Sequence, residues 1–299
     1  MNRRLRTLAV ILVVNFAVAS GAHAQRSVKT PAPAATRKAA HVAVQEFSFH
    51  SDSLGREMKY MAILPQGYAE SARHYPVLYL LHGWNGDYTN WVKLTNVVAD
   101  AKPYPFIIIT PNAGNSWYIN SNVNPQERVE DYIIRDLLRE VDQRLRTIAS
   151  PHRRAIAGLS MGGYGAVLYA LKHPDLFQMA GSISGAFDGP VGIESVLPQL
   201  QPSLLSSYGP MGDPSRAAND VYTLAASSAT SLPYLVLECG SADLLLPSNR
   251  RFVEILAAQK IAYEYHESPG AHTWSFWDGS LPLLLEAVEK RIGQKEQSN

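Results

Sequence analysis

The segment RRAIAGLSMGGYGAVLYALKHP, residues 153–174, constrains the fold more than any other part of the chain. An apolar run ends in glycines around Ser160, and residues with helical periodicity follow. This order predicts a strand, a tight turn and a helix that ends before Pro174. Gly158 and Gly162 flank the serine in a GxSxG pattern, where only glycine lets the two backbones approach closely. The turn is therefore either a tight connection or a support that exposes the Ser160 hydroxyl.

Strands and helices alternate along the rest of the chain. Alternating apolar and polar residues predict an N-terminal hairpin over 42–65, and apolar runs predict buried strands over 75–83, 104–112, 178–185 and 232–240. Helices are predicted over 87–101, 125–147, 249–260 and 280–293, with a strand over 261–268. This alternation predicts the α/β class, with a mostly parallel central sheet and helices on both faces. No boundary or repeat divides residues 42–293, so we expect one domain there.

The first 24 residues have the pattern of a bacterial-type signal peptide. A basic start precedes an apolar run over residues 8–19, and Ala22-His23-Ala24 is a small-x-small cleavage site. The apolar run is shorter than the roughly 20 residues that a membrane span needs, so a permanent anchor is the weaker alternative. The sequence predicts cleavage after Ala24 and a periplasmic or secreted protein without stable membrane insertion. Residues 25–41 are expected to form a flexible Pro/Ala-rich tether, and residues 294–299 a polar tail.

Charge and cysteine content narrow the expected partners. The chain has 27 basic and 26 acidic residues, and loss of the three signal arginines leaves a net charge of −2. This near-neutral balance argues against nucleic acid or an anionic membrane as the main partner. Cys239 is the single cysteine, so no internal disulfide forms, and its place in an apolar run indicates a small buried residue. CxxC and HExxH patterns are absent, and we expect no metal and no cofactor.

A serine becomes a strong nucleophile only when a base takes its proton and an acid orients that base. On a strand–turn–helix elbow these partners follow in the order serine, acid, histidine, on loops after later strands. Asp243 lies just beyond the strand over 232–240, with Glu238 as its rival. His272 lies in a loop between the last strand and the last helix. The rival His266 falls within the strand pattern, so the sequence favours Ser160, Asp243 and His272.

Two backbone amides are expected to hold the negative charge that develops during attack on an ester. Met161 follows the nucleophile at a helix N-terminus, where free N–H groups favour negative charge. The second amide comes from the loop after an earlier central strand, and Gly83 there allows close approach of the Trp84 amide. We expect His82 to have a structural hydrogen-bonding role. A phosphate-binding loop is a poor alternative, because no Gly-Lys-Ser/Thr follows the glycines.

Six ordered blocks carry a family resemblance: YLLHGWNGDYTNW, TPNAGNSWYINS, RAIAGLSMGGYGA, LKHPDLF, SISGAFD and PGAHTWSFW. They resemble the esterase D/Putative esterase family of α/β-hydrolases, which includes S-formylglutathione hydrolases, feruloyl and acetyl-xylan esterases, and secreted mycolyltransferases. The resemblance covers the chain from about Val42 to Ile292. It implies an α/β-hydrolase catalytic domain over 42–293, with the catalytic residues and oxyanion amides already proposed.

These features predict an exported serine carboxylic-ester hydrolase that works through an acyl-enzyme. The expected substrates are small-molecule or carbohydrate esters with short-chain acyl or aryl groups. Export argues against the glutathione-thioester role of the formylglutathione branch. Two other functions stay open: an acyltransferase that uses a sugar hydroxyl as acceptor, and a non-catalytic binding protein on a hydrolase scaffold.

The walls of the substrate site are less readable. Aromatic residues near the expected loops form either a wall for an acyl or aryl group or packing around the histidine loop; they are Trp117, Tyr118, Trp274, Phe276 and Trp277. The segment over 187–231 is where a substrate-shaping insertion is expected. The sequence does not identify the acyl chain, the alcohol or the oligomeric state.

Overall fold

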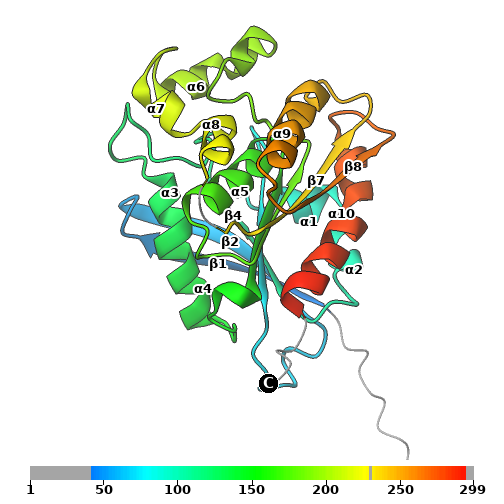
Figure 1. The fold of residues 1–299 in the computed structure, drawn as a ribbon. Coiled ribbons are helices and arrows are strands. Elements are labelled where there is room, and N and C mark those ends of the chain that lie inside the picture. The colour runs from blue at the N-terminus through cyan, green and yellow to red at the C-terminus, as the bar shows by residue number, and fades with distance from the viewer. Residues whose placement is uncertain (1–41, 229–230, 294–299) are drawn as a thin grey trace, which may run out of the picture. The chain divides into compact units, whose positions relative to one another are not determined.

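The computed structural model describes residues 42–228 and 231–293 (Figure 1). The predicted signal peptide (1–24), tether (25–41) and polar tail (294–299) lie outside the described residues. In the described part of the chain, no helix combines the length and the apolar character that a membrane crossing needs.

An eight-stranded sheet in the order β1-β2-β4-β3-β5-β6-β7-β8 forms the centre of the domain (Figure 1). The strands are β1 (Ala43–Ser51), β2 (Arg56–Leu64), β3 (Val77–Leu81), β4 (Ile107–Pro111), β5 (Arg154–Leu159), β6 (Met179–Ile183), β7 (Tyr234–Gly240) and β8 (Tyr263–Ser268). β2 is antiparallel to both of its neighbours, and every other neighbouring pair is parallel. The predicted hairpin and the mostly parallel sheet are confirmed.

Helices cover both faces of the sheet (Figure 1). One face carries α3 (Val129–Asp131), α4 (Leu138–Arg144), α5 (Met161–Lys172), α8 (Val221–Ala226) and α9 (Leu246–Ala258). The other face carries α1 (Asn90–Leu94), α2 (Val97–Asp100) and α10 (Trp274–Val288). In β3, Tyr79 faces the first core and Leu78 the second, and both are fully buried. This alternation of side chains across a strand builds two separate cores from one sheet.

Three helices differ from the sequence prediction. The span predicted over 87–101 is broken into α1 and α2, because the Asn96 amide donates to the Asp278 carboxylate instead of continuing the helix. The span predicted over 125–147 contains a π-helical stretch, η1 (Tyr132–Leu137), between α3 and α4. The last helix begins at Trp274 rather than residue 280, since Gly279 and Pro282 inside it obscure its periodicity in the sequence.

The segment over 187–231 is an insertion between β6 and β7. Its described part contains η3 (Ile193–Ser195), η4 (Pro198–Leu200), α6 (Gln201–Tyr208), α7 (Pro214–Ala218) and α8. The Tyr164 hydroxyl on α5 donates to the Asn219 carbonyl at 2.7 Å, which ties the insertion to the helix that follows Ser160. The predicted insertion therefore lies against the elbow.

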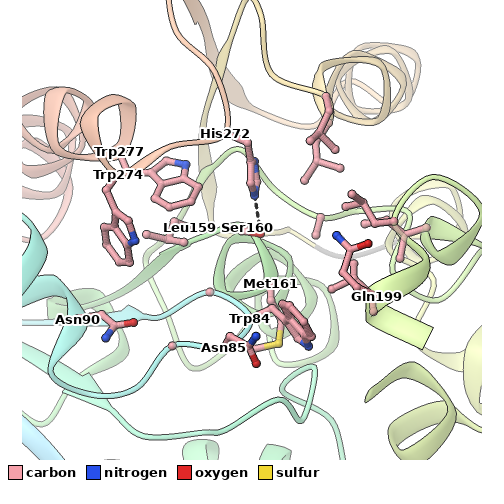
Figure 2. A pocket seen from close by; sticks show the side chains of 18 of the residues that line it. Trp84, Asn85, Asn90, Leu159, Ser160, Met161, Gln199, His272, Trp274 and Trp277 are labelled. Atoms are coloured by element: carbon pink, nitrogen blue, oxygen red, sulfur yellow. Dashed lines mark hydrogen bonds between the residues drawn. The ribbon is translucent and has the colours of Figure 1, made fainter. Parts of the chain in front are cut away.

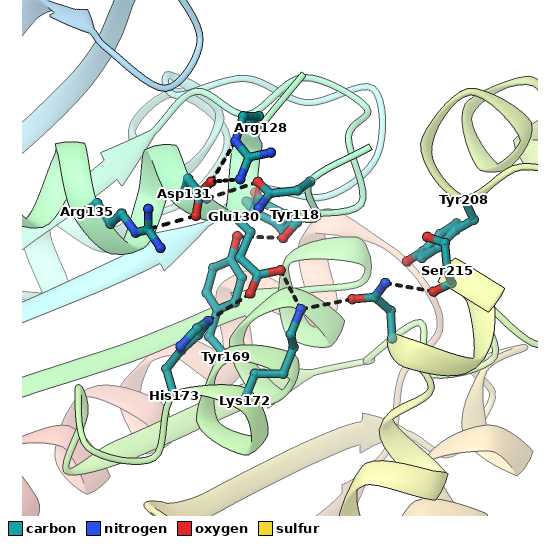
Figure 3. A network of polar contacts seen from close by, with 12 residues as sticks. Tyr118, Arg128, Glu130, Asp131, Arg135, Tyr169, Lys172, His173, Tyr208 and Ser215 are labelled. Atoms are coloured by element: carbon teal, nitrogen blue, oxygen red, sulfur yellow. Dashed lines mark hydrogen bonds and ion pairs between the residues drawn. The ribbon is translucent and has the colours of Figure 1, made fainter. Parts of the chain in front are cut away.

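A polar network joins α3, the end of α5 and this insertion (Figure 3). The Lys172 ammonium donates to the Glu130 carboxylate at 2.5 Å and to the Asn219 side chain at 3.2 Å. His173 Nε2 lies 2.8 Å from the other Glu130 oxygen. Burial alone would raise the pKa of Glu130, but the contacts with His173 and Lys172 outweigh it, and the pKa is lowered. Glu130 is thus held as a carboxylate.

Candidate active site

Ser160 lies on a sharp turn between β5 and α5. Its backbone has φ 53° and ψ −117°, a conformation that L-residues rarely adopt. A Cβ on Gly158 would lie 2.5 Å from backbone atoms of Gly162, and a Cβ on Gly162 would lie 2.6 Å from the His82 carbonyl oxygen. Both contacts are too short for any side chain. The close approach expected from the GxSxG pattern is therefore present at both glycines.

The structure brings the Ser160, His272 and Asp243 side chains together. His272 Nε2 lies 3.0 Å from Ser160 Oγ, and its Nδ1 lies 3.0 and 3.1 Å from the two Asp243 oxygens. The two rivals lie elsewhere: the Glu238 carboxylate accepts from Ser268, and His266 contacts Glu264. The chain of hydrogen bonds runs from hydroxyl to imidazole to carboxylate, as proton removal from a serine requires.

Asp243 is held as a buried carboxylate. Its side chain has no exposed surface, and the Leu245 N–H donates to Oδ1 at 2.8 Å. Burial raises the pKa of this carboxyl, but the His272 contact and the Leu245 hydrogen bond favour the charged form, and the pKa is lowered. An ionised Asp243 accepts a hydrogen bond from the Nδ1–H group of His272, which leaves the Nε2 lone pair of His272 facing Ser160.

His82 supports the loop that follows β3. Nε2 accepts from the Ala113 N–H at 3.0 Å, so Nδ1 carries the proton and donates to the Gly83 carbonyl at 2.8 Å. Burial lowers the pKa of His82, which keeps the ring neutral. His82 does not contact Ser160 and instead joins the Gly83–Trp84 loop to the loop after β4, in agreement with the expected structural role.

The Trp84 and Met161 amides have no hydrogen-bond acceptor within the described ranges, and both residues border the same cavity as Ser160. Met161 is the first residue of α5, so its N–H is one of the unpaired groups at a helix N-terminus. The Trp84 indole donates to the buried Ser203 hydroxyl at 3.1 Å, which fixes the loop against α6. Two unpaired donors beside one serine can hold a developing oxyanion.

Ser160 opens into a cavity of about 480 Å³ (Figure 2). The tryptophan side of this cavity carries Asn90, Leu159, Trp274 and Trp277 (Figure 2), and the lining residue Leu94 lies one helical turn beyond Asn90. The aliphatic side consists of residues that belong to one hydrophobic core or pack against it, together with Gln199 and Leu244 beside them in the chain; the residues in or against that core are Ala186, Ile193, Leu197, Leu200 and Leu245. Figure 2 shows Gln199 and the two tryptophans on opposite sides of Ser160. None of the described residues that line the cavity is an Asp, Glu, Lys or Arg, and His272 is the one basic side chain among them.

The aromatic residues proposed for the substrate wall divide into two groups. Trp117, Trp274 and Trp277 line the cavity, and the Trp277 ring packs edge-to-face against His272 at 4.9 Å. Tyr118, proposed as a substrate-binding residue, and Phe276, left open between wall and packing, do not line the cavity. Tyr118 is fully buried under α5, where its hydroxyl donates to the His82 carbonyl at 2.9 Å. Phe276 packs beneath Gly270 and does not line the cavity.

Several wall residues carry no motif and were not predicted. Leu94 follows Asn90 by one helical turn, so the two share a face of α1. Leu244 directly follows Asp243, and both it and Leu94 are about half exposed. In the sequence, Leu244 could have been found from its position beside Asp243, and Leu94 from its position in the helix predicted over 87–101.

Within 42–228 and 231–293, no group of His, Cys, Asp and Glu could hold a metal ion. Burial raises the pKa of the Cys239 thiol to about 12, so this cysteine stays protonated, as expected for a residue inside a strand.

A serine on a strand–helix elbow, hydrogen-bonded to histidine at the carboxyl edge of a parallel sheet, defines the class of α/β-hydrolase serine hydrolases. Within this class, the Putative esterase family model matches residues 51–287, and the chain belongs to that family. The protein is a serine esterase, so the hypothesis of a non-catalytic binding protein is set aside.

Named relatives agree with this placement. The chain is 26% identical to an acetyl esterase of Caldicellulosiruptor saccharolyticus, over 83% of this chain and 99% of the relative. It is 30% identical to esterase Rv1288 of Mycobacterium tuberculosis, of which it spans 59% of the length. Among solved structures, FphF, a fluorophosphonate-binding serine hydrolase of Staphylococcus aureus, matches with a TM-score of 0.75 and 25% identity over 83% and 98% of the two chains.

Proposed function

We propose that this esterase is exported and hydrolyses carboxylic esters with Ser160 as nucleophile, His272 as base and Asp243 as the residue that orients His272. One observation carries the proposal: the hydrogen-bonded series Ser160–His272–Asp243 stands on a strained elbow that opens into an uncharged cavity. Backbone strain of this kind clusters at functional sites, where the surrounding structure holds it in place.

Acylation follows from this geometry. The Ser160 hydroxyl gives its proton to His272 Nε2 as Oγ bonds to the ester carbonyl carbon. The carbonyl oxygen becomes an oxyanion that accepts from the Trp84 and Met161 amides. His272 then donates the same proton to the leaving alcohol oxygen as the ester C–O bond breaks, and the acyl group stays on Ser160. Asp243 stabilises the imidazolium throughout.

Deacylation repeats these steps with water. His272 Nε2 takes a proton from water, and the hydroxide oxygen bonds to the acyl carbon. The second tetrahedral oxyanion uses the same two amides. When the bond to Ser160 breaks, His272 returns the proton to Oγ, and the carboxylic acid leaves. The enzyme returns to its starting state, and the steps consume only the ester and water.

The cavity favours neutral esters. Apart from His272 its walls offer hydroxyl, amide and apolar groups, so a substrate carboxylate inside it would lack a cationic partner. This supports uncharged acyl, aryl or carbohydrate esters over a thioester whose charged portion enters the cavity. Relatives named acetyl esterase and endo-1,4-beta-xylanase/feruloyl esterase are in accord with this substrate class.

Acyl transfer is the second candidate, because relatives include a mycolyltransferase of Mycobacterium leprae that is 24% identical over 83% of this chain. A sugar hydroxyl would then replace water in the second step. Product analysis with a p-nitrophenyl ester and an excess of glucose or trehalose separates the two outcomes: acylated sugar supports transfer, and free acid alone supports hydrolysis.

Matched variants test the proposed base. His272→Gln should lower kcat for p-nitrophenyl acetate by at least about 10³-fold, while His266→Gln should stay near the parent rate. Both proteins should unfold at the parent temperature, which shows that lost activity is not lost folding. Equal activity of His272→Gln and the parent would refute the assignment of the base.

A further inference from the structure

The two sides of the cavity belong to different hydrophobic cores. Leu159 and Trp277 on the tryptophan side are part of the core beneath α1 and α10. Ile193, Leu200 and Leu245 on the aliphatic side are part of the core beneath α5, α8 and α9. Because Ser160 stands between the cores, each side can receive a different part of an ester.

The tryptophan side is closed by aromatic packing. Trp274 packs edge-to-face against the fully buried Trp91 at 6.1 Å and against Trp277 at 5.1 Å. Such perpendicular ring pairs favour one arrangement, so this side resists widening. It is suited to a small or flat group.

An ion pair between Arg216 and Glu194 orders the aliphatic side before any substrate binds. Arg216 on α7 is 4% exposed and lies 3.0 Å from Glu194 on η3. Its guanidinium also donates to the Gly209 carbonyl at 3.0 Å. These contacts fix the turn that carries Ile193, so binding does not have to order this wall.

Apolar surface continues from the aliphatic side to solvent. Leu244 lines the cavity and yet leaves 47% of its surface exposed, and it directly precedes Leu245 in the buried core. Gln199 is polar, and the indole N–H groups of the lining residues Trp84 and Trp117 are already paired with the Ser203 hydroxyl on α6. A sugar would leave most of its hydroxyls without partners here, whereas a hydrocarbon chain would cover the exposed leucine.

We propose that the aliphatic side binds an unbranched aliphatic chain of the substrate ester, longer than an acetyl group, with Leu244 covering its outer end. This rests on the proposed ester hydrolysis and names its substrate class. Each additional methylene buried against the wall should raise kcat/KM about fourfold until the chain passes Leu244.

The test compares chain lengths on both ends of the ester. The first ratio is kcat/KM for p-nitrophenyl octanoate over p-nitrophenyl acetate, which places the chain in the acyl group. The second is kcat/KM for octyl acetate over ethyl acetate, which places it in the alcohol. At least one ratio should exceed one, and Leu244→Gln should lower that ratio about tenfold, because the amide cannot cover the chain without losing water.

Leu205→Gln is the matched control, because Leu205 on α6 is 42% exposed and does not line the cavity. It should leave the affected ratio within twofold of the parent. The proposal is overturned if both parental ratios fall below one, or if Leu205→Gln lowers the ratio as much as Leu244→Gln does. Failure of the proposed function looks different: His272→Gln would then keep the parental rate on p-nitrophenyl acetate.

Discussion

The strain at Ser160 is held in place by hydrogen bonds of its own backbone. The Ser160 N–H donates to the Ile183 carbonyl at 2.9 Å, and the Ser160 carbonyl accepts from the Ala186 and Tyr164 N–H groups at 3.0 Å each. These bonds attach the residue to β6 and α5 at once, so its positive φ cannot relax locally. The hydroxyl is thereby fixed at the edge of the sheet, 3.0 Å from His272.

Replacing Asp243 with asparagine tests the role of the carboxylate at the same scale. An amide at this position can donate to His272 Nδ1, which moves the ring proton to Nε2 and removes the acceptor for the Ser160 hydroxyl. Asp243→Asn should therefore lower kcat for p-nitrophenyl acetate by about 10⁴-fold at neutral pH. Glu238→Gln is the control and should stay within a few-fold of the parent; an equal loss in both variants would contradict the assignment of the acid.

At the scale of elements, the elbow depends on contact between β5 and α5. A Cβ on Gly158 would meet Gly162 backbone atoms at 2.5 Å and Leu81 Cβ at 2.9 Å. Gly158→Ala should therefore lower the free energy of unfolding by about 1–3 kcal/mol or more, measured by urea denaturation. Gly279→Ala is the control. No atom lies within 4 Å of a Cβ at Gly279 inside α10, so this variant should gain about 0.5–1 kcal/mol. Equal stability of both variants would show that β5 and α5 are not in close contact.

The network around Glu130 predicts a pH-dependent link between α3, α5 and the insertion (Figure 3). Because the pKa of Glu130 is lowered by folding, its contribution to stability is complete above the ordinary value of 4.5 and is lost as the pH falls through the folded value. Glu130→Gln should cost about 1–3 kcal/mol at pH 7, since the amide keeps one of the two acceptor oxygens and loses the negative charge that Lys172 and His173 face.

Urea unfolding of parent and Glu130→Gln at pH 7 and near pH 3 checks this link. The difference in unfolding free energy should shrink at the lower pH, where the parent carboxyl is itself protonated. A difference that stays constant or grows toward acid would contradict the charged state assigned to Glu130.

For the whole molecule, the sequence predicted the order and type of most elements and the residues that meet at the elbow. The elbow over residues 153–174 could be predicted because its turn needs glycine on both sides of the serine. The acid and the histidine could be predicted because they follow the serine on loops after later strands. The aliphatic residues of the cavity walls were not predicted, because Ile193, Leu94 and Leu244 come singly from elements far apart in sequence. Tyr118 was misplaced because its aromatic character does not reveal which way a loop residue points.

Export of the chain is predicted from residues 1–24, which lie outside the described residues. Expression in a bacterial host with an intact secretion system should yield a periplasmic or secreted protein that starts at Gln25. Intact mass and N-terminal sequencing measure this directly. A chain that retains residues 1–24 in the cytoplasm would contradict the signal-peptide assignment and leave the site untouched.

Covalent labelling of the folded protein tests the central claim, that His272 and Asp243 make Ser160 a nucleophile, most directly. A fluorophosphonate should add one phosphonyl group per chain, and peptide mass spectrometry should find it on Ser160. His272→Gln should react at least about 10³-fold more slowly, while Ser195→Ala, which removes an exposed hydroxyl on η3, should react at the parent rate. Modification at another residue, or equal labelling rates for the parent and His272→Gln, would contradict the account.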